Sequence, residues 1–222
     1  MSRTLDRPRV AIFARVPTHG RVKTRLAAGV GDAAALRIYE ALLASTLREL
    51  APGRGTFEPE IWVDGDLDAF AGWQRRNAAT GQRELHFPLI AQCEGDLGER
   101  MAWAFDQGVH VLVGTDIPEM TASYVEEAAA ALRVADLVLG PTEDGGYCLI
   151  GMNSPRPELF QGVPWGTADV LASTLHAANT LRVELLDAMW DVDDPEDLAR
   201  WQSAEVRTPT HPQGTPSSAS GC

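Results

Sequence analysis

The 222-residue chain contains a single lysine, Lys23, although it has 19 basic residues, so arginine supplies almost all of its positive charge. Cysteine is also scarce, and Cys93, Cys148 and Cys222 show neither a CxxC spacing nor a Cys/His pattern, which argues against a disulfide framework and a structural zinc site. No apolar run approaches the roughly 20 residues that cross a membrane, and the N-terminal MSRTLDRPR is unlike a signal peptide. We therefore expect a cytoplasmic protein without a membrane partner.

Several catalytic signatures are missing as well. The sequence has no GxSxG nucleophile elbow, no HExxH, no Walker GxxxxGK[ST] and no GxGxxG after its first apolar run. The five histidines are scattered, which speaks against a histidine-led mechanism. A net charge of −12 repels nucleic acids. A local basic loop in this field would still attract a small anion, and the acids could hold a divalent cation, so we expect small phosphorylated metabolites as ligands.

Short apolar runs alternate with helical patterns along most of the chain. The runs predict strands over residues 9–15, 60–64, 85–91, 110–113, 136–140, 147–152 and 181–186. Periodic patterns predict helices over residues 32–50, 67–77, 97–107, 121–133, 168–178 and 195–201. This alternation predicts an α/β layer sandwich with a largely parallel sheet. Residues 1–203 are expected to form one domain, and the Pro-, Ser- and Thr-rich stretch 204–222 a disordered tail.

Positive charges gather directly after the first predicted strand, in the loop GRVKTRL (Gly20 to Leu26). Arg21, Lys23 and Arg25 alternate there, so an extended loop would point all three the same way. Such a cluster is self-repelling unless an anion lies among the heads, and phosphate is the usual anion, bound by lysine as a point charge and by arginine as a fork. The alternative is a solvated basic turn.

Carboxylates follow three later strands. Asp116 lies where an apolar run meets a turn, where a carboxylate without a partner is costly. Mg²⁺ prefers one or two carboxylates together with substrate phosphates, and Asp116 with Asp193 would satisfy the protein's share. Asp116 could instead cap the helix that begins near Thr121, or bond turn amides. In DVDDPEDL, Asp194 resembles a helix cap, which leaves Asp191 and Asp193 free.

Two glycine-bearing loops are further candidates. In GPTEDGGY (Gly140 to Tyr147), backbone can approach a ligand closely while Glu143 or Asp144 accepts hydrogen bonds from hydroxyls, although a simple tight turn explains the glycines equally well. Gln92 and the segment GDLGER (Gly95 to Arg100) open a helix and are suited to a nucleobase edge or to phosphate at amide groups.

Taken in order, six motifs resemble the DUF2064 family: IFARVPTHGRVKTRL, QCEGDLGERMAWAF, VLVGTDIPEM, DLVLGPTEDGGYCLIG, VPWGTADV and DVDDPEDL. They extend from about residue 9 to residue 201. The resemblance implies membership of the GT-A superfamily of nucleotide-diphospho-sugar transferases. Members of the DUF2064 family are often labelled as glycosyltransferases associated with radical-SAM enzymes or arsenosugar biosynthesis. It further implies a three-layer α/β/α Rossmann-like GT-A fold with a mostly parallel mixed sheet, a nucleotide in the cleft, and Mg²⁺ or Mn²⁺.

The family's functional residues carry over to four positions. Lys23 and Arg25 match its phosphate-side VKTRL, Asp116 its metal-binding aspartate, and Asp193 the aspartate of its closing DxDTPEDL.

The chain departs from the family's pattern at Arg15, Ile117 and Asp194, where lysine, cysteine and threonine are usual. None of these changes removes a proposed metal ligand, although Arg15 alters the expected phosphate contacts. The complete set of predicted site residues is: for catalysis, Lys23, Asp144 and Glu143; for nucleotide and phosphate, Arg15, Gly20, Arg21, Lys23, Arg25, Gln92, Gly98 and Arg100; for metal, Asp116 and Asp193.

The sequence leaves two reactions open. We expect glycosyl transfer from a nucleotide-diphosphate sugar to a small-molecule acceptor, with Lys23 and the metal stabilising the departing diphosphate and Asp144 or Glu143 orienting or deprotonating an acceptor hydroxyl. The alternative is nucleotidyl transfer from an NTP to a phosphorylated small molecule with release of pyrophosphate, as in nucleotidyltransferases such as 2-phospholactate guanylyltransferase. A third possibility, a nucleotide-binding regulatory module, has less support because both anion-binding and metal-binding candidates are present.

Overall fold

A mixed sheet forms the centre of the computed structural model, which describes residues 7–78 and 86–207. Within these residues, seven strands pair in the order β3-β2-β1-β4-β6-β5-β7. Neighbouring strands are parallel except for β6, which runs antiparallel to both β4 and β5. The strands are β1 (Arg9–Arg15), β2 (Glu58–Asp64), β3 (Leu89–Ala91), β4 (Val111–Val113), β5 (Leu137–Pro141), β6 (Tyr147–Met152) and β7 (Val183–Leu185). The predicted mostly parallel mixed sheet is confirmed.

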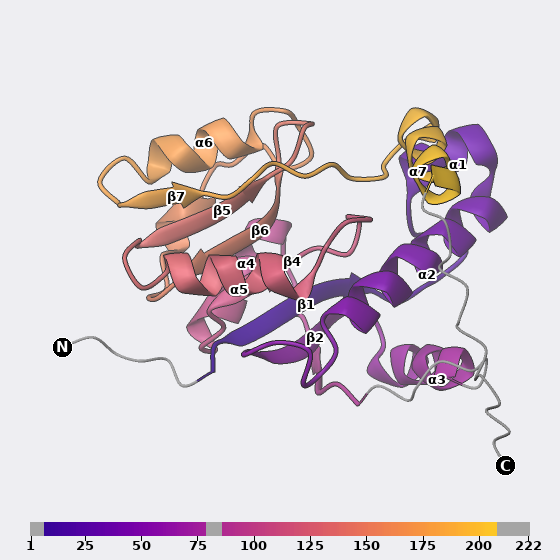
Figure 1. Ribbon diagram of the computed structural model, residues 1–222, viewed down its shortest axis with the longest axis horizontal. Coiled ribbons are helices and arrows are strands. Elements are labelled where there is room, and N and C mark those ends of the chain that lie inside the picture. The colour runs from indigo at the N-terminus through magenta and orange to yellow at the C-terminus, as the bar shows by residue number, and fades with distance from the viewer. Residues whose placement is uncertain (1–6, 79–85, 208–222) are drawn as a thin grey trace, which may run out of the picture.

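Helices cover both faces of this sheet, so the architecture is the predicted three-layer sandwich (Figure 1). Side chains of α2, α3 and α5 share one apolar core with the sheet, and those of α4, α6 and the short 3₁₀ helix η1 share a second. The helices are α1 (Thr24–Val30), α2 (Asp32–Glu49), α3 (Leu67–Ala78), α4 (Leu97–Asp106), α5 (Ala122–Ala131), η1 (Pro157–Phe160), α6 (Val170–Ala177) and α7 (Pro195–Arg207). None of the helices in the described parts of the chain is both long and apolar enough to cross a membrane.

Capping residues mark two helix starts clearly. Asp96 and Glu99 form a capping box at α4, and the Thr121 hydroxyl accepts a hydrogen bond from the Tyr124 amide at the predicted start of α5. At α2 the residue before the helix is Gly31, with φ of 82°, and Asp32, the first residue of the predicted range, is the first helical residue. Its charge there still favours the helix N-terminus.

The predicted elements differ from the structure mainly at three places. Helix α1 was not predicted: it begins at Thr24, so Arg25 is helical and the loop from Gly20 to Leu26 is not extended as expected. Strand β3 begins only at Leu89, because Pro88 precedes it and has no amide hydrogen for a ladder; the predicted first residue, 85, lies outside the described residues. Helix α7 continues to Arg207, which is past the predicted start of the tail at residue 204. Residues 208–222 of that predicted tail lie outside the described part.

One long connection brings the end of the chain back to the edge of the sheet where the parallel strands end. After β7 the chain crosses the molecule to α7, which packs beside α1 and α2 (Figure 1). On the way, the Val192 amide donates a hydrogen bond to the Asp116 carbonyl at 3.1 Å. This bond places Asp191 and Asp193 beside the turn that follows β4.

Candidate nucleotide and metal site

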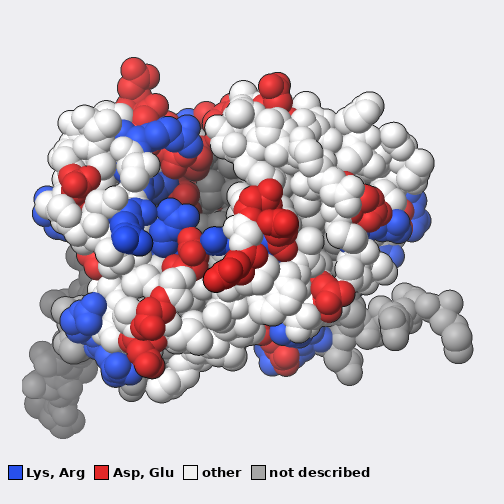
Figure 2. All heavy atoms as spheres, turned by 180° about the vertical axis from the view of Figure 1, so that it is seen from behind, with Lys and Arg blue, Asp and Glu red and all other residues white. Residues whose placement is uncertain are grey.

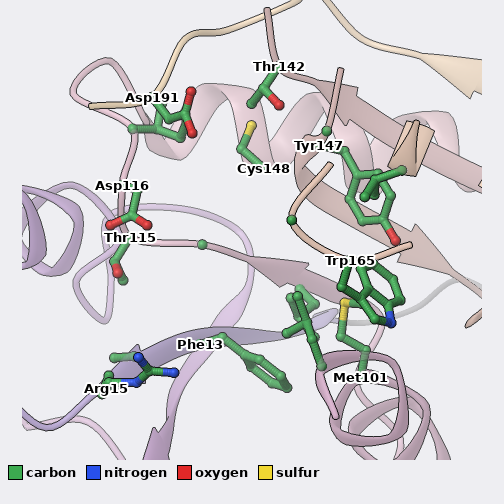
Figure 3. A pocket seen from close by; sticks show the side chains of 18 of the residues that line it. Phe13, Arg15, Met101, Thr115, Asp116, Thr142, Tyr147, Cys148, Trp165 and Asp191 are labelled. Atoms are coloured by element: carbon green, nitrogen blue, oxygen red, sulfur yellow. The ribbon is translucent and has the colours of Figure 1, made fainter. Parts of the chain in front are cut away.

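A pocket of about 420 Å³ opens at this edge of the sheet. Parallel α/β sheets bind ligands beyond the carboxyl ends of their strands, and residues from the ends of β1, β2 and β4 line this pocket. Figure 3 shows charged side chains on one side of it and apolar ones on the other: Arg15, Asp116 and Asp191 face Phe13, Met101, Tyr147 and Trp165. Figure 2 shows basic and acidic side chains close together around a hollow on one face of the molecule.

Lys23 lies at the centre of the charged side. Its ammonium nitrogen is 2.8 Å from Asp116 Oδ1 and 2.8 Å from Asp193 Oδ1. The lysine side chain is only 4% exposed. Burial by itself lowers the pKa of Lys23, but the two carboxylates outweigh burial and raise it, so the amine is held as ammonium. We call Lys23, Asp116 and Asp193 the lysine cluster.

The two acids of the lysine cluster differ in their other contacts. Asp116 Oδ1 is buried, and the Lys23 ammonium is its only polar partner in the described residues, although 44% of the Asp116 side chain is exposed. Asp193 also pairs with Arg25, whose side chain is 67% exposed. The structure therefore brings together residues from three distant parts of the sequence.

Two more acids line the pocket nearby. Burial raises the pKa of Asp191 to about 6, and the charges of Asp193 and Asp144 add to this shift. Asp144 is anchored by the Thr142 hydroxyl and by the Gly146 amide, which donate to its Oδ1. This part of the pocket therefore has more negative than positive charge, as a divalent cation would require.

The carboxylates fit a divalent metal of the Mg²⁺ or Mn²⁺ type. Asp116 and Asp193 present oxygens that already converge on one cation, the Lys23 ammonium, and carboxylate oxygens are the donors that such metals prefer. No group of three or more His, Cys, Asp or Glu side chains in the described residues is arranged to hold a metal alone. With Asp116 and Asp193 as its protein ligands, Mg²⁺ would take phosphates and water to complete its shell, which is its usual arrangement in nucleotide sites.

A second ion cluster lies at the ends of β1 and β2. Asp64 accepts from Arg15 Nε at 2.8 Å and pairs with Arg100 Nη1 at 3.0 Å. Burial raises the pKa of Asp64, but the two arginines outweigh burial and lower it, so the carboxylate is ionised. We call Arg15, Asp64 and Arg100 the arginine cluster. Sequence reasoning missed Asp64, although it is the last residue of β2 and lies at the same edge of the sheet.

Among the other predicted nucleotide-binding residues, only Gln92 lines the pocket, and its amide donates to the Trp62 carbonyl at 2.8 Å. Gly20 and Arg21 lie in an exposed turn, where the Arg21 carbonyl accepts from Arg15. Gly98 is buried in α4, and a Cβ there would meet Trp165 at 3.0 Å, so its observed role is close packing.

The two adjacent predicted catalytic acids point to different partners. Asp144 lines the pocket, whereas Glu143 forms a two-bond ion pair with Arg200 at 2.6 and 2.9 Å and is absent from the pocket lining. Glu143 and Arg200 are both largely solvent-exposed. Asp144 is therefore the better placed of the two to meet a ligand.

Aromatic residues without a predicted role complete the pocket. Tyr39 of α2 fixes the end of β1, because its hydroxyl accepts from the Arg15 amide at 2.8 Å and donates to the Arg15 carbonyl at 2.9 Å. Tyr147 and Trp165 pack edge to face at 6.4 Å on the apolar side. Burial raises the pKa of Tyr147 to about 12, so its hydroxyl is neutral.

Residues 46–167, more than half of the chain, match the family described as an uncharacterized protein conserved in bacteria, DUF2064. The chain belongs to the DUF2064 family. The matched segment contains Asp64, Arg100, Asp116 and Asp144 of the pocket. The resemblance drawn from the sequence motifs is thus confirmed.

Known relatives of this DUF2064 chain carry transferase names. A crystal structure of a protein from Desulfovibrio desulfuricans G20, provisionally described as a nucleotide-diphospho-sugar transferase, is 32% identical with a TM-score of 0.76, and the match covers 90% of this chain and 88% of that one. A 3-phospho-D-glycerate guanylyltransferase from Phenylobacterium zucineum (strain HLK1) is 30% identical over 139 residues, which are 61% of this chain and 62% of that protein.

A more distant structure supports the fold only. A cytidylyltransferase from Leptospira borgpetersenii serovar Hardjo-bovis (strain JB197) is 9% identical with a TM-score of 0.53, and the match covers 92% of this chain and 89% of that one. The predicted Rossmann-like fold of the nucleotide-sugar transferase type is confirmed, and the predicted transferase class agrees with the names of these relatives.

Proposed function

We propose that this DUF2064 protein is a metal-dependent nucleotidyltransferase that joins the nucleoside monophosphate part of an NTP to a phosphorylated small acid, with release of pyrophosphate. The observation that carries the proposal is the convergence of Asp116 and Asp193 on the ammonium of Lys23, which lines the pocket together with Asp116. Two acids and one buried cation at one point suit a metal–triphosphate complex, which brings both a cation and anions. The guanylyltransferase name of the Phenylobacterium relative supports GTP as the first donor to test.

In this proposal the two sides of the pocket bind different parts of the substrates. The donor nucleotide lies at the charged side, where Arg15 and Arg100 offer guanidinium groups to phosphate or to a base edge, and Gln92 offers an amide. The body of the acceptor lies toward Tyr147 and Trp165. Its phosphate reaches back to the lysine cluster, where the reaction takes place.

The transfer itself requires charge neutralisation and alignment more than acid–base chemistry. An acceptor phosphate oxygen forms a bond to the α-phosphorus while the bond from that phosphorus to the bridging oxygen breaks, and pyrophosphate leaves with the electron pair. Lys23 donates hydrogen bonds to phosphate oxygens whose negative charge grows during this step. A bound divalent cation, held by Asp116 and Asp193, would neutralise further charge on the phosphates.

Glycosyl transfer from a nucleotide-diphosphate sugar is the second candidate. It is favoured by the description of the Desulfovibrio relative and by Asp144, a pocket carboxylate that could orient or deprotonate an acceptor hydroxyl. In that reaction Lys23 would face the departing diphosphate in place of pyrophosphate.

Product analysis separates the two candidates. The protein is incubated with Mg²⁺, each of the four NTPs and 3-phosphoglycerate or a panel of other phosphorylated acids, and pyrophosphate is measured with a coupled phosphatase assay. We expect release of pyrophosphate that depends on both Mg²⁺ and the acceptor. Release of nucleoside diphosphate from nucleotide sugars, without pyrophosphate from any NTP, would overturn nucleotidyl transfer in favour of the second candidate.

A further inference from the structure

Lys23 occupies the point at which the two metal-binding carboxylates converge. We propose that Lys23 is an internal counter-ion that holds this position in the metal-free protein, and that a divalent cation displaces its ammonium from Asp116 and Asp193 toward the phosphates of the donor. The inference rests on the metal and phosphate positions of the proposed function. It adds that the metal and Lys23 compete for the same two oxygens.

The distances make simultaneous occupancy unfavourable. Nζ lies 2.8 Å from Oδ1 of both Asp116 and Asp193, and a Mg²⁺ ion bound to those oxygens would lie at roughly 2.0 to 2.1 Å from each. The ammonium and the metal would then be direct neighbours in a buried place, and like charges repel strongly there. One of the two cations must leave.

Without any cation the two carboxylates would instead repel each other. The side chain of Lys23 is 4% exposed, so the ammonium is held by the protein and not by water. Arg25 cannot substitute for it, because Arg25 is largely exposed and, within the described residues, pairs with Asp193 alone. Lys23 therefore keeps the two acids together until a metal arrives.

The backbone of Lys23 is also held in an unusual conformation. Its φ of 49° and ψ of 48° are left-handed, and it is the only residue other than glycine with a positive φ in the described residues. Side chains other than glycine rarely adopt this region, and they persist there where surrounding contacts enforce it. The two ion pairs of its side chain and the hydrogen bond from the Ala27 amide to its carbonyl are contacts of this kind.

The competition makes metal and nucleotide binding depend on each other. If only a small fraction of molecules has Lys23 withdrawn, the apparent affinity for free metal is the intrinsic affinity multiplied by that fraction. A nucleotide changes this balance because its phosphates give the displaced ammonium a new anionic partner. The metal is therefore expected to bind more tightly together with a nucleotide than alone.

The first test measures Mn²⁺ binding without nucleotide by the loss of the free-ion signal in electron paramagnetic resonance. Lys23→Met removes the charge and keeps the chain length, and Arg25→Met is the matched control from the same loop. We expect Lys23→Met to bind Mn²⁺ at least about tenfold more tightly than the wild type, and Arg25→Met to differ by less than about threefold. Equal or weaker binding by a folded Lys23→Met protein, as judged by thermal unfolding, would overturn the inference.

The second test uses the unaltered protein and so does not depend on how the variant folds. Lys23 is the only lysine of the chain, so acetylation of the peptide that contains it, measured by mass spectrometry, reports on this one side chain. We expect saturating Mn²⁺ to speed its acetylation several-fold relative to NaCl of equal ionic strength, and added nucleoside diphosphate to protect it again. An unchanged rate with Mn²⁺ bound, or no Mn²⁺ binding by either the wild type or a folded Lys23→Met, would refute the inference.

These outcomes are separable from those of the proposed function, because neither test reads a reaction product. Pyrophosphate release with unchanged Lys23 acetylation would refute the counter-ion role alone. Metal-dependent acetylation without any pyrophosphate would leave the counter-ion role intact and refute nucleotidyl transfer.

Discussion

The two ion clusters at the mouth of the pocket have opposite compositions. In the lysine cluster one cation, Lys23, lies between two carboxylates, whereas in the arginine cluster one carboxylate, Asp64, lies between two guanidinium groups. The first has negative charge in surplus and the second has positive charge in surplus. In both clusters the charged groups pair with one another in the absence of ligand. Each cluster still attracts a ligand whose charge is opposite to its own surplus.

The central side chains of the two clusters also differ in how deeply they are buried. The cation of the lysine cluster is almost fully enclosed, while Asp64 and Arg100 of the arginine cluster are 28% and 24% exposed. Electrostatic effects are stronger in the enclosed place because water screens less there. We therefore expect substitutions in the lysine cluster to have the larger effects on binding. We also expect them to change metal affinity, whereas substitutions in the arginine cluster should change nucleotide affinity alone.

The largest effect is expected for Asp116→Asn. This change removes a negative charge from the metal position and should weaken Mg²⁺-dependent nucleotide binding by about 100-fold or more, since even residues that only support a metal ligand can cost 10- to 100-fold. Isothermal titration with GTP at several Mg²⁺ concentrations measures it. Asp136→Asn, at an exposed ion pair with Arg182, is the matched control. Unchanged affinity in the Mg²⁺ titration would refute the ligand assignment.

Lys23→Met should change the two affinities in opposite directions. Binding of a nucleoside diphosphate should weaken by roughly tenfold to 100-fold, because a charged hydrogen bond contributes about 1.5 to 3 kcal/mol, while binding of the bare nucleoside should hardly change. Affinity for Mn²⁺ alone should rise, as described above. Equal losses for the nucleoside and its diphosphate would indicate that Lys23 acts through packing instead.

Asp64→Asn should affect the nucleotide without affecting the metal. Loss of the shared carboxylate leaves Arg15 and Arg100 to repel each other, so both guanidinium groups lose their fixed positions and nucleotide affinity should fall about tenfold. Mn²⁺ affinity in the absence of nucleotide should stay within about twofold, since the ion pairs of Asp64 in the described part of the chain are with Arg15 and Arg100 and not with the lysine cluster. Parallel titrations with Mn²⁺ and with nucleotide test this, and a parallel loss of both would show that the two clusters are not independent.

The smallest effect on the rate of pyrophosphate release is expected for Glu143→Gln, and Asp144→Asn is the variant with which it is compared. Glu143 pairs with exposed Arg200 away from the pocket, so pyrophosphate release should stay within about twofold of the wild type. Asp144 lines the pocket between other acids, so its removal should change the rate more. A larger loss for Glu143→Gln than for Asp144→Asn would restore the catalytic role that the sequence suggested for Glu143.

The sequence predicted the layers and the edge of the sheet at which the site lies. Strand β1 and strand β6 have the predicted bounds, because buried apolar runs end sharply at Arg15 and at Met152. Asp116 was predicted because a carboxylate where a buried strand meets a turn is costly without a partner, and Asp193 because it follows the last strand in DVDDPEDL; the fold brings both to Lys23. The residue types and their position after strands were sufficient for this.

The sequence did not predict which distant side chains would pair. Nothing in the pattern distinguishes Asp144, which turns to the pocket, from Glu143, which turns to Arg200. The Lys23 ammonium between the acids was also unexpected, because the loop and the closing motif were assigned to phosphate and to metal separately. Such contacts depend on how the connection after β7 returns across the sheet.

An anomalous difference map from crystals grown with Mn²⁺ and a non-hydrolysable GTP analogue would examine the lysine cluster itself. We predict Mn²⁺ between Asp116 and Asp193, at the place that the Lys23 ammonium holds without metal, and Lys23 turned onto the phosphates of the analogue. Mn²⁺ bound elsewhere, with Lys23 still between the two carboxylates, would contradict both the metal assignment and the role proposed for Lys23.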